Sequence, residues 1–276
     1  MIEVDDDTGR RVVLTQEARR IVSLVPSLTE TLFAFGAGPA VVGATRYCSE
    51  PAVMPEHVQR VGGTKNPHVG GIVALQPDLV LMNAEENRKE DFDALERSGL
   101  TVFVCLPRRA RDTADLLRRL AQLTGASGAA QAMVDELQEA LRAADQFPAA
   151  TRHRVFCPIW KNPWMSFNHD TYADDMLSLA GGVNVCRLRS ERYCLINLDD
   201  VAAAQPEIVL LPDEPYVFSS KDLAALVPLR ETPAWQNGRI HFIDGKSLSW
   251  YGPRTAPAVR YLRALVHRSD AVGGNS

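Results

Sequence analysis

The chain has 276 residues, of which 46% are hydrophobic, enough to fill the cores of two domains. Its 30 basic and 34 acidic residues give a net charge of −4, and no basic stripe is available to bind the phosphates of a nucleic acid. No apolar run reaches the ~20 residues of a membrane-spanning helix. The acidic start, residues 1–7, lacks the apolar core of a secretory leader, so the chain as given is expected to stay in the cytoplasm unless a leader has been removed.

The first part of the chain alternates short apolar runs with amphipathic segments. Pro26, Ser27 and Glu30 have the pattern of a strand-to-helix turn with a capping box, and weak alternation at residues 11–14 predicts the arm of a β-hairpin. Strands that alternate with helices predict a mostly parallel sheet covered on both faces. Strands are expected at residues 20–25, 41–44, 79–82 and 101–106, and helices at residues 26–35, 72–75, 89–98 and 112–124.

A long amphipathic segment follows at residues 127–146. Its apolar residues recur at helical spacing, Ser127 is suited to cap its amino end, and Phe147-Pro148 ends it because proline cannot continue a helix. At 1.5 Å per residue, such a helix would be roughly 28 Å long. We interpret it as a rigid connector, since the sequences on its two sides are related.

The second half repeats the plan of the first. Strands are expected at residues 154–159, 208–212 and 240–243, helices at residues 172–180, 198–203, 222–226 and 256–267, and a disordered tail at residues 272–276. Ala74-Leu75-Gln76-Pro77-Asp78-Leu79-Val80-Leu81 is echoed by Ala203-Ala204-Gln205-Pro206-Glu207-Ile208-Val209-Leu210, and Arg46-Tyr47-Cys48 returns as Arg192-Tyr193-Cys194.

We therefore predict an α/β protein with two Rossmann-like lobes, each with a mostly parallel sheet, and a ligand cleft between them. The amino-terminal lobe comprises residues 1–125, one long backbone helix comprises residues 126–148, and the carboxy-terminal lobe comprises residues 149–276.

Aromatic residues gather where the predicted strands end. Ligands of open α/β sheets bind beyond the carboxyl ends of the strands. Aromatic rings supply large, rigid faces there, so two lobes that present them to one another would hold a large, flat, partly apolar ligand. The alternative is that each ring only packs its own loop. The residues concerned are Tyr47, Trp160, Trp164, Tyr193, Tyr216, Trp250 and Tyr251.

The sequence carries little that indicates catalysis. Glu85-Glu86 and Asp213-Glu214 follow equivalent strands and would be suited to acid–base chemistry or to a hard cation. However, adjacent strand residues point to opposite sides, so each lobe would aim only one carboxylate inward. The sequence has no nucleophile-elbow, Walker or dinucleotide-binding motif. These observations favour a binding protein over an enzyme.

Four motifs in fixed order resemble one known family. The chain resembles the helical-backbone metal receptors, the class III substrate-binding proteins of ABC importers for cobalamin, haem and iron–siderophore complexes. The resemblance covers about residues 20–266 and is closest to the cobalamin-binding branch. The motifs are Ile21-Val22-Ser23-Leu24-Val25-Pro26-Ser27-Leu28-Thr29-Glu30, Gly63-Thr64-Lys65-Asn66-Pro67, Gly181-Gly182-Val183-Asn184 and Trp250-Tyr251-Gly252-Pro253-Arg254-Thr255.

The resemblance implies a monomeric binding protein for a metal chelate, with no catalytic residues and no required cofactor. The ligand it implies is cobalamin or another corrinoid, with haem or an iron–siderophore complex as the alternative. It also implies a periplasmic or cell-surface location, in contrast to the cytoplasmic expectation above.

The expected ligand-binding residues follow from the same resemblance. Tyr47 and Tyr193 match aromatic residues of the corrinoid site, one in each lobe. Arg254 could pair with a propionate, phosphate or hydroxamate group, or bridge to a nearby acid. The full set is Tyr47, Lys65, Asn66, Asn83, Asn87, Trp160, Tyr193, Trp250, Tyr251 and Arg254.

Three residues are candidates for direct metal ligation. Cys48 and Cys194 each follow an Arg-Tyr pair, and they could ligate cobalt or iron, close a disulfide across the cleft, or only fill space behind the tyrosines. An enzyme that acts on a metal cofactor through these cysteines is the less favoured alternative. His68 is either an axial ligand through its neutral imidazole or a surface histidine with no metal role.

Docking on an importer permease uses one acidic residue per lobe in this family. The second lobe has Asp199 and Asp200 at the start of the relevant short helix, whereas the first lobe has Gly70 and Gly71. The resemblance therefore leaves two alternatives, a chain that does not dock or one that uses Glu30 or another acid in its first lobe.

Overall fold

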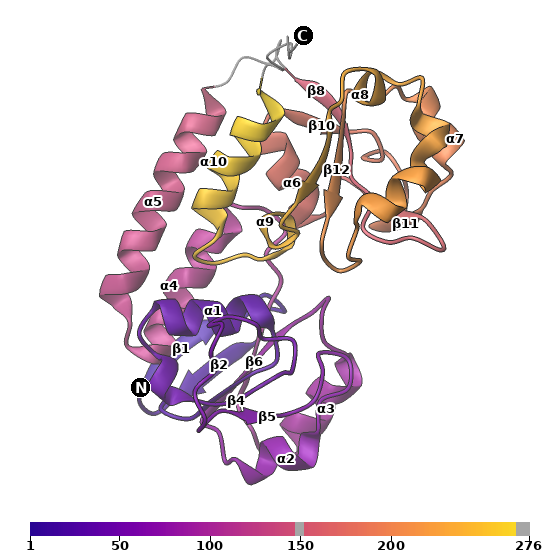
Figure 1. Ribbon diagram of the computed structural model, residues 1–276. Helices are drawn as coiled ribbons and strands as arrows, with labels where there is room; N and C mark the ends of the chain where they lie inside the picture. Colours follow the sequence, from indigo (N-terminus) through magenta and orange to yellow (C-terminus); the bar gives the residue numbers. More distant parts are fainter. Residues whose placement is uncertain (147–151, 269–276) are drawn as a thin grey trace. The chain divides into compact units, whose positions relative to one another are not determined.

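The computed structural model describes residues 1–146 and 152–268 (Figure 1). The chain divides into two compact units. Unit 1 comprises Met1–Pro107, Arg111–Gln138 and Trp250–Pro253, and unit 2 comprises Arg108–Ala110, Glu139–Ser249 and the described residues from Arg254 onward. The division into lobes at residues 125 and 148 stays a prediction. The helix stop at Phe147-Pro148 and the tail at residues 272–276 lie outside the described residues.

Unit 1 is built on a five-stranded parallel sheet with the strand order β5-β4-β3-β6-β7. Its central strands are short and fully buried, which is typical of a sheet covered on both faces. An antiparallel hairpin, β1 (Ile2–Asp5) and β2 (Arg11–Leu14), confirms the predicted arm. The strands are β3 (Ile21–Ser23), β4 (Val41–Ala44), β5 (Gln59–Arg60), β6 (Leu79–Asn83) and β7 (Val102–Cys105), and the helices are α1 (Pro26–Ala34), η1 (Gly38–Ala40), α2 (Val69–Ala74), α3 (Lys89–Arg97) and α4 (Asp112–Thr124).

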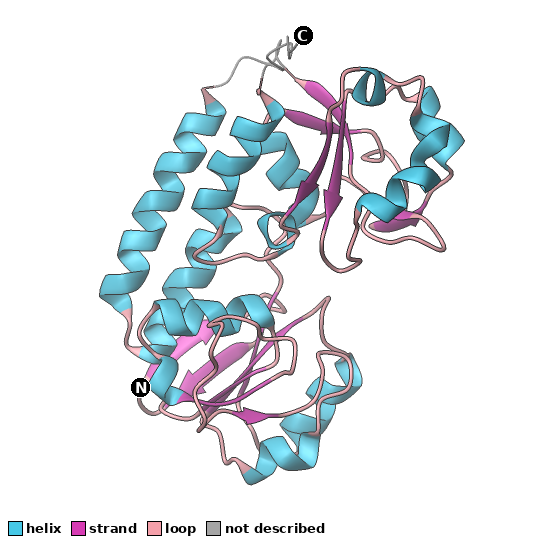
Figure 2. Ribbon diagram, in the orientation of Figure 1, coloured by secondary structure: helices cyan, strands magenta, loops and turns pink. Residues whose placement is uncertain are grey.

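Unit 2 has a four-stranded parallel sheet with the order β10-β8-β12-β13, and helices flank it on both sides (Figure 2). A separate antiparallel pair joins β9 (Met165–Phe167) to β11 (Tyr193–Leu195). The other elements are β8 (His153–Phe156), α6 (Tyr172–Leu179), β10 (Gly182–Asn184), α7 (Leu198–Ala203), β12 (Ile208–Pro212), η3 (Ser220–Leu229), α8 (Pro233–Gln236), β13 (Ile240–Ile243), α9 (Lys246–Ser249) and α10 (Thr255–Val266).

The internal repeat of the sequence is also a repeat of topology. In each sheet the first strand in the chain (β3 or β8) lies between β4 and β6 or between β10 and β12, and β7 or β13 follows at the edge. Unit 1 has β5 as an additional edge strand beside β4. The predicted α/β fold with mostly parallel sheets is therefore confirmed. The matched order also means that equivalent loops follow equivalent strands.

The echoed Gln-Pro-acid sequences form the same turn in both units. Gln76 and Gln205 adopt left-handed conformations, with φ of 46° and 50°. The following acid then reaches the start of the first strand: Asp78 accepts hydrogen bonds from the backbone of Arg20, and Glu207 accepts one from the backbone of Arg154. Because the side chain connects a helix end to a neighbouring strand, this turn fixes the register of each helix against its sheet.

The long connector is present as α5 (Ser127–Asp145), a helix of 19 residues. Its buried positions recur every three or four residues, as the spacing predicts. Residues up to Gln138 belong to unit 1 and residues from Glu139 belong to unit 2. The buried side chains are Ala130, Val134, Leu137, Ala140 and Ala144.

Three local predictions differ from the structure. The capping box at Ser27 and Glu30 is wrong, because the cap residue of α1 is Val25, two residues before Ser27, with Pro26 at the first helical position and no side chain bonded to the helix end. The helix at residues 222–226 is part of the 3-10 helix η3, which starts where Ser219 donates to the carboxylate of Asp222. Strands β5, β9, β10 and β11 were not expected. Among the described helices, none is long and apolar enough to cross a membrane.

Candidate ligand-binding site

The loops at the carboxyl edge of the unit-1 sheet are held together by one buried asparagine. The amide nitrogen of Asn87 donates to the carbonyl oxygens of Leu24 and Thr64, at 3.2 and 2.9 Å, and its amide oxygen accepts from the backbone of Asn83 at 2.8 Å. These bonds join the loops that follow β3, β5 and β6. Asn87 therefore holds these loops in place from the buried side of the edge.

Asn83 and Tyr251 form a second buried support at this edge. The amide of Asn83 donates to the phenol oxygen of Tyr251 at 2.9 Å, and the thiol of Cys105 lies 3.4 Å from the same oxygen. Burial raises the pKa of Tyr251 well above its ordinary value and the pKa of Cys105 to about 12, so both groups stay protonated at neutral pH. The polar atoms of these three residues therefore bond within the protein and are not available to a ligand.

Tyr47 is the exposed aromatic residue of the unit-1 edge. It lies in the turn after β4, and 53% of its surface is exposed. Directly behind it, Cys48 is buried, with its sulfur 3.0 Å from the hydroxyl of Thr29 and 3.3 Å from that of Thr45. Burial raises the pKa of the Cys48 thiol, which disfavours the thiolate that a metal would need. The contacts support the space-filling alternative for Cys48.

The matching pair in unit 2 is oriented by a strand. Successive residues of β11 point to opposite faces, so Tyr193 is 44% exposed while Cys194 packs in the hydrophobic core beside Cys186 and Leu198. Burial also raises the pKa of the Cys194 thiol. Cys48 and Cys194 are both free thiols, so the structure does not show the alternative of a disulfide between them. Within residues 1–146 and 152–268, no group of three or more metal-ligating side chains is present.

Trp160 and Tyr193 belong to one apolar face of unit 2. Trp160 forms an antiparallel bridge with Met165, and Leu195 lies opposite Met165 in the β9–β11 register. Directly paired residues share a face of a sheet, as do residues two apart on a strand. Trp160, Met165, Leu195 and Tyr193 are therefore on the same side, with Trp160 42% exposed. Met165 and Leu195 were not expected from the sequence, because the strand pair that aligns them was not predicted.

A buried ion pair supports Trp160. Its ring packs edge-on against Tyr216, with 5.7 Å between ring centroids, and the hydroxyl of Tyr216 donates to Asp222 at 3.3 Å. The ammonium of Lys161 lies 2.7 Å from the same carboxylate. The hydrogen bond from Lys161 holds the pKa of Asp222 below its ordinary value, at about 2. The Lys161–Asp222 ion pair therefore supports the aromatic face through Tyr216.

Two expected ligand-binding residues are engaged elsewhere. Trp250 is buried rather than exposed, so it contributes to packing instead of offering a free ring. The guanidinium of Arg254 lies 3.6 Å from the carboxylate of Asp244, which favours the alternative of a bridge to a nearby acid.

Lys65, Asn66 and His68 are exposed in the loop that follows β5 in unit 1. Lys65 donates to the backbone carbonyl of Glu85. The imidazole of His68 rests over Gly71, where a β-carbon would lie 2.6 Å from its Nδ1 atom. Their position at the carboxyl edge keeps all three available to a ligand.

The expected docking acids differ between the units. Asp199 and Asp200 are exposed in the first turn of α7, and Asp200 pairs with Arg189 at 2.9 Å. The equivalent helix α2 has no acid in its first turn. Glu30 is half-buried in α1.

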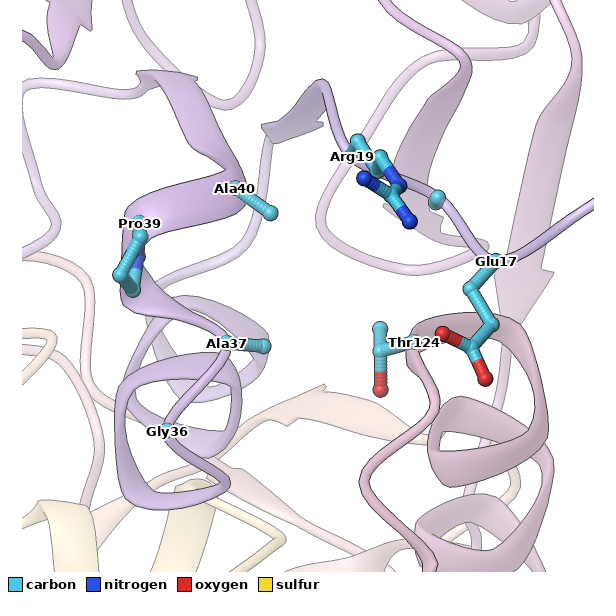
Figure 3. A pocket seen from close by; sticks show the side chains of 8 residues that line it. Glu17, Arg19, Gly36, Ala37, Pro39, Ala40 and Thr124 are labelled. Carbon is cyan, nitrogen blue, oxygen red and sulfur yellow. The ribbon is translucent and has the colours of Figure 1, made fainter.

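An open pocket of about 320 Å³ lies at the opposite edge of unit 1 (Figure 3). Glu17 and Arg19 precede β3, while Pro39 and Ala40 precede β4, so the pocket is at the amino ends of the strands. Ligands of open α/β sheets bind at the carboxyl ends. We therefore do not identify this pocket as the candidate site.

Known proteins match almost the whole chain. A vitamin B12-binding protein of Vibrio cholerae serotype O1 is 23% identical over 246 residues, which cover 89% of this chain and 88% of that protein. The uncharacterized ABC transporter substrate-binding lipoprotein YvrC of Bacillus subtilis (strain 168) is 25% identical over 282 residues and covers 96% of this chain, with 85% of its own length matched.

Two solved structures share the fold. The periplasmic vitamin B12-binding protein BtuF of Vibrio cholerae has a TM-score of 0.78 at 22% identity, covering 90% of this chain and 96% of its own. The periplasmic haem-binding protein BhuT, in complex with two haems, has a TM-score of 0.76 at 27% identity, covering 90% and 97%. Residues 21–246 match the family described as periplasmic binding protein. Because this match spans most of the sequence and agrees with the fold, the chain belongs to the periplasmic binding protein family.

Proposed function

We propose that this protein binds a metal chelate, cobalamin or another corrinoid, and delivers it to an ABC importer. The observation that carries the proposal is the placement of the exposed rings. Tyr47 lies at the carboxyl edge of the unit-1 sheet, Trp160 follows β8 in unit 2, and Tyr193 lies on the same face as Trp160, in the β9–β11 pair. Matched relatives that are named vitamin B12-binding proteins support the choice of ligand.

The energetic contribution of such rings is sufficient for specific binding. Burying one large apolar side chain contributes about 1.5–3 kcal/mol, and a micromolar affinity corresponds to about 8 kcal/mol. Three rings therefore supply a large part of that free energy, before the costs of association are subtracted. Each ring should matter individually.

The first prediction concerns these three rings. We expect cyanocobalamin to quench the intrinsic tryptophan fluorescence, and Tyr47→Ala, Trp160→Ala and Tyr193→Ala each to weaken binding about tenfold or more. Tyr261→Ala is the matched control, because Tyr261 is an equally exposed ring (42%) on α10, away from the strand ends. No binding of cyanocobalamin, cobinamide or haem at tens of micromolar would contradict the proposal.

Haem is the second candidate ligand, supported by the 27% identity to a haem-binding protein and by the exposed His68 in the loop after β5. The same titration distinguishes it. Haem ligation would shift the Soret band, and replacement of His68 by alanine would remove that shift if the imidazole is an axial ligand.

We also infer a location outside the cytoplasm, in place of the cytoplasmic expectation from the amino terminus. The family description as periplasmic and the lipoprotein among the relatives support this inference. Fractionation of host cells, followed by immunoblotting, tests it.

A further inference from the structure

Two cations lie on the exposed surface around Tyr47. The guanidinium of Arg46 lies 5.0 Å from the centroid of the Tyr47 ring, and its Nη2 atom donates to the Tyr47 hydroxyl at 3.1 Å. The ammonium of Lys65 donates to the carbonyl oxygen of Glu85, from the loop that follows β6. Both side chains are exposed.

A glycine brings these groups into one cluster. A β-carbon at Gly63 would lie 3.2 Å from the ring of Tyr47, 3.5 Å from the guanidinium of Arg46 and 2.5 Å from the amide oxygen of Asn66. Gly63 therefore allows the Lys65–Asn66 loop to lie directly against the tyrosine and the arginine. The bond from Asn87 to the carbonyl oxygen of Thr64 fixes the same loop to the sheet edge.

Neither cation has a carboxylate partner. Within the part of the chain that the structure describes, the ion pairs involve neither Arg46 nor Lys65, whereas Lys161, Arg189 and Arg254 each pair with an acid. The contacts of Arg46 and Lys65 are to neutral oxygens. Within the described residues, no close ion pair therefore engages either cation beside the exposed Tyr47 ring.

We infer that this edge of unit 1 recognises an anionic substituent on the ligand, while the Tyr47 ring contacts its flat body. The inference rests on the proposed function and narrows it to chelates that carry a phosphodiester or a carboxylate. Guanidinium groups bind both through paired N–H donors, and stacking on Tyr47 orders the Arg46 side chain before binding. Arg254, the candidate from the sequence, already faces Asp244.

Two matched ligand pairs test this inference. Cobalamin carries a phosphodiester that cobinamide lacks, and haem carries two carboxylates that its dimethyl ester lacks. We expect the protein to prefer the acidic member of the pair that it binds, with a preference that weakens as salt rises. The ligand pair that shows this preference identifies whether the recognised anion is a phosphodiester or a carboxylate.

Variants that remove the two positive charges test whether Arg46 and Lys65 cause this preference. Arg46→Gln combined with Lys65→Gln should weaken binding of the acidic ligand about tenfold or more, because hydrogen bonds to charged groups are strong, and should leave the other ligand within about threefold. Arg46→Lys, which keeps the charge, should restore part of the preference. Arg19→Gln is the matched control, since Arg19 is exposed at the opposite edge of the same sheet.

The outcomes separate the two proposals. An equal loss for both members of a pair, or no loss for either, overturns the anion site and leaves the proposed function standing. If the wild-type protein binds none of the four compounds, the proposed function fails and the anion site fails with it.

Discussion

At the residue scale, the carboxylate of Asp222 organises the side chains beneath Trp160. It accepts hydrogen bonds from Lys161, Tyr216 and Ser219 while almost fully buried. Buried charges require such partners, because removal of one partner leaves an uncompensated charge. The Trp160 ring packs against Tyr216, so its position depends on the hydrogen bond that Tyr216 donates to the buried Asp222.

We predict that Asp222→Asn weakens ligand binding and lowers stability. The variant should lower the free energy of unfolding by about 1.5–3 kcal/mol, since strong hydrogen bonds to a charged group are lost, and should shift the Trp160 fluorescence of the free protein. Asp115→Asn is the control, because its exposed ion pair with Arg118 contributes little. Unchanged fluorescence together with unchanged affinity would rule out the positioning role.

The same group gives a pH dependence with a defined sign. The pKa of Asp222 is held at about 2 in the folded protein, against an ordinary value of about 3.9 in unfolded chains. The stabilisation is therefore fully present above about pH 4 and is lost as the pH falls towards 2. Acid titration of the unfolding free energy should show a smaller loss in Asp222→Asn than in the wild type.

At the element scale, the β1–β2 hairpin covers the edge strand β7. Asp7 donates its backbone N–H to Val104 at 3.0 Å, and Arg10 donates to the carbonyl oxygen of Val102 at 3.0 Å. An uncovered edge strand presents unpaired backbone groups. Asp6, whose side chain is fully buried, orders the hairpin turn by accepting from Thr8 and Arg10.

We predict that Asp6→Ala destabilises unit 1 by about 1–3 kcal/mol, because buried donors lose their acceptor. Burial alone would raise the pKa of Asp6, but hydrogen bonds from Thr8 and Arg10 outweigh it and lower the pKa. The contribution is thus present above the unfolded pKa and lost as the pH falls through the folded one. Urea unfolding at neutral pH measures the effect, and the exposed Asp5→Ala is the control. Equal stabilities of the two variants would contradict it.

The sequence predicted the elements that have clear boundaries. Helices α4 and α7 and strands β4, β12 and β13 have the expected bounds, because periodic apolar residues end at turn or capping signals. Strands β9 and β11 have three residues each, too few for alternation to be recognised, and β10 follows a helix end so closely that its glycines indicated only the stop.

The site residues also divide into those whose position the local sequence predicts and those whose position depends on tertiary contacts. The exposed positions of Tyr47 and Trp160 agree with a place after strands that the local sequence predicts. Tyr193 is exposed as well, but in β11, a strand that was not predicted. The burial of Trp250 and the pairing of Arg254 with Asp244 depend on tertiary contacts that no local pattern contains. The inward direction of Cys194 followed from strand alternation, once β11 was known.

At the scale of the whole molecule, family membership confirms the prediction of a binding protein rather than an enzyme. The two units share strand order and turn chemistry but differ at one equivalent place. Helix α7 starts with Asp199 and Asp200, whereas α2 starts with Val69-Gly70-Gly71. Carboxylates in a first helical turn are favourable to the helix as well as exposed to a partner. If the protein docks on a permease through the start of this helix, then of the two equivalent helices only α7 of unit 2 provides carboxylates for docking.

We therefore predict that docking depends on unit 2 and can be strengthened in unit 1. Asp199→Asn with Asp200→Asn should lower uptake of radiolabelled cyanocobalamin by host cells, while the purified variant keeps its affinity, because neither acid is among the residues proposed to contact the ligand. Gly70→Glu should raise uptake, since a β-carbon there would meet only His68, at 3.9 Å. Gly71→Ala, whose β-carbon would approach His68 at 2.6 Å, is the control for disturbing α2 without adding charge. Normal uptake by the double variant would show that the acids of α7 do not dock, and a loss of affinity in the same variant would place them with the ligand instead.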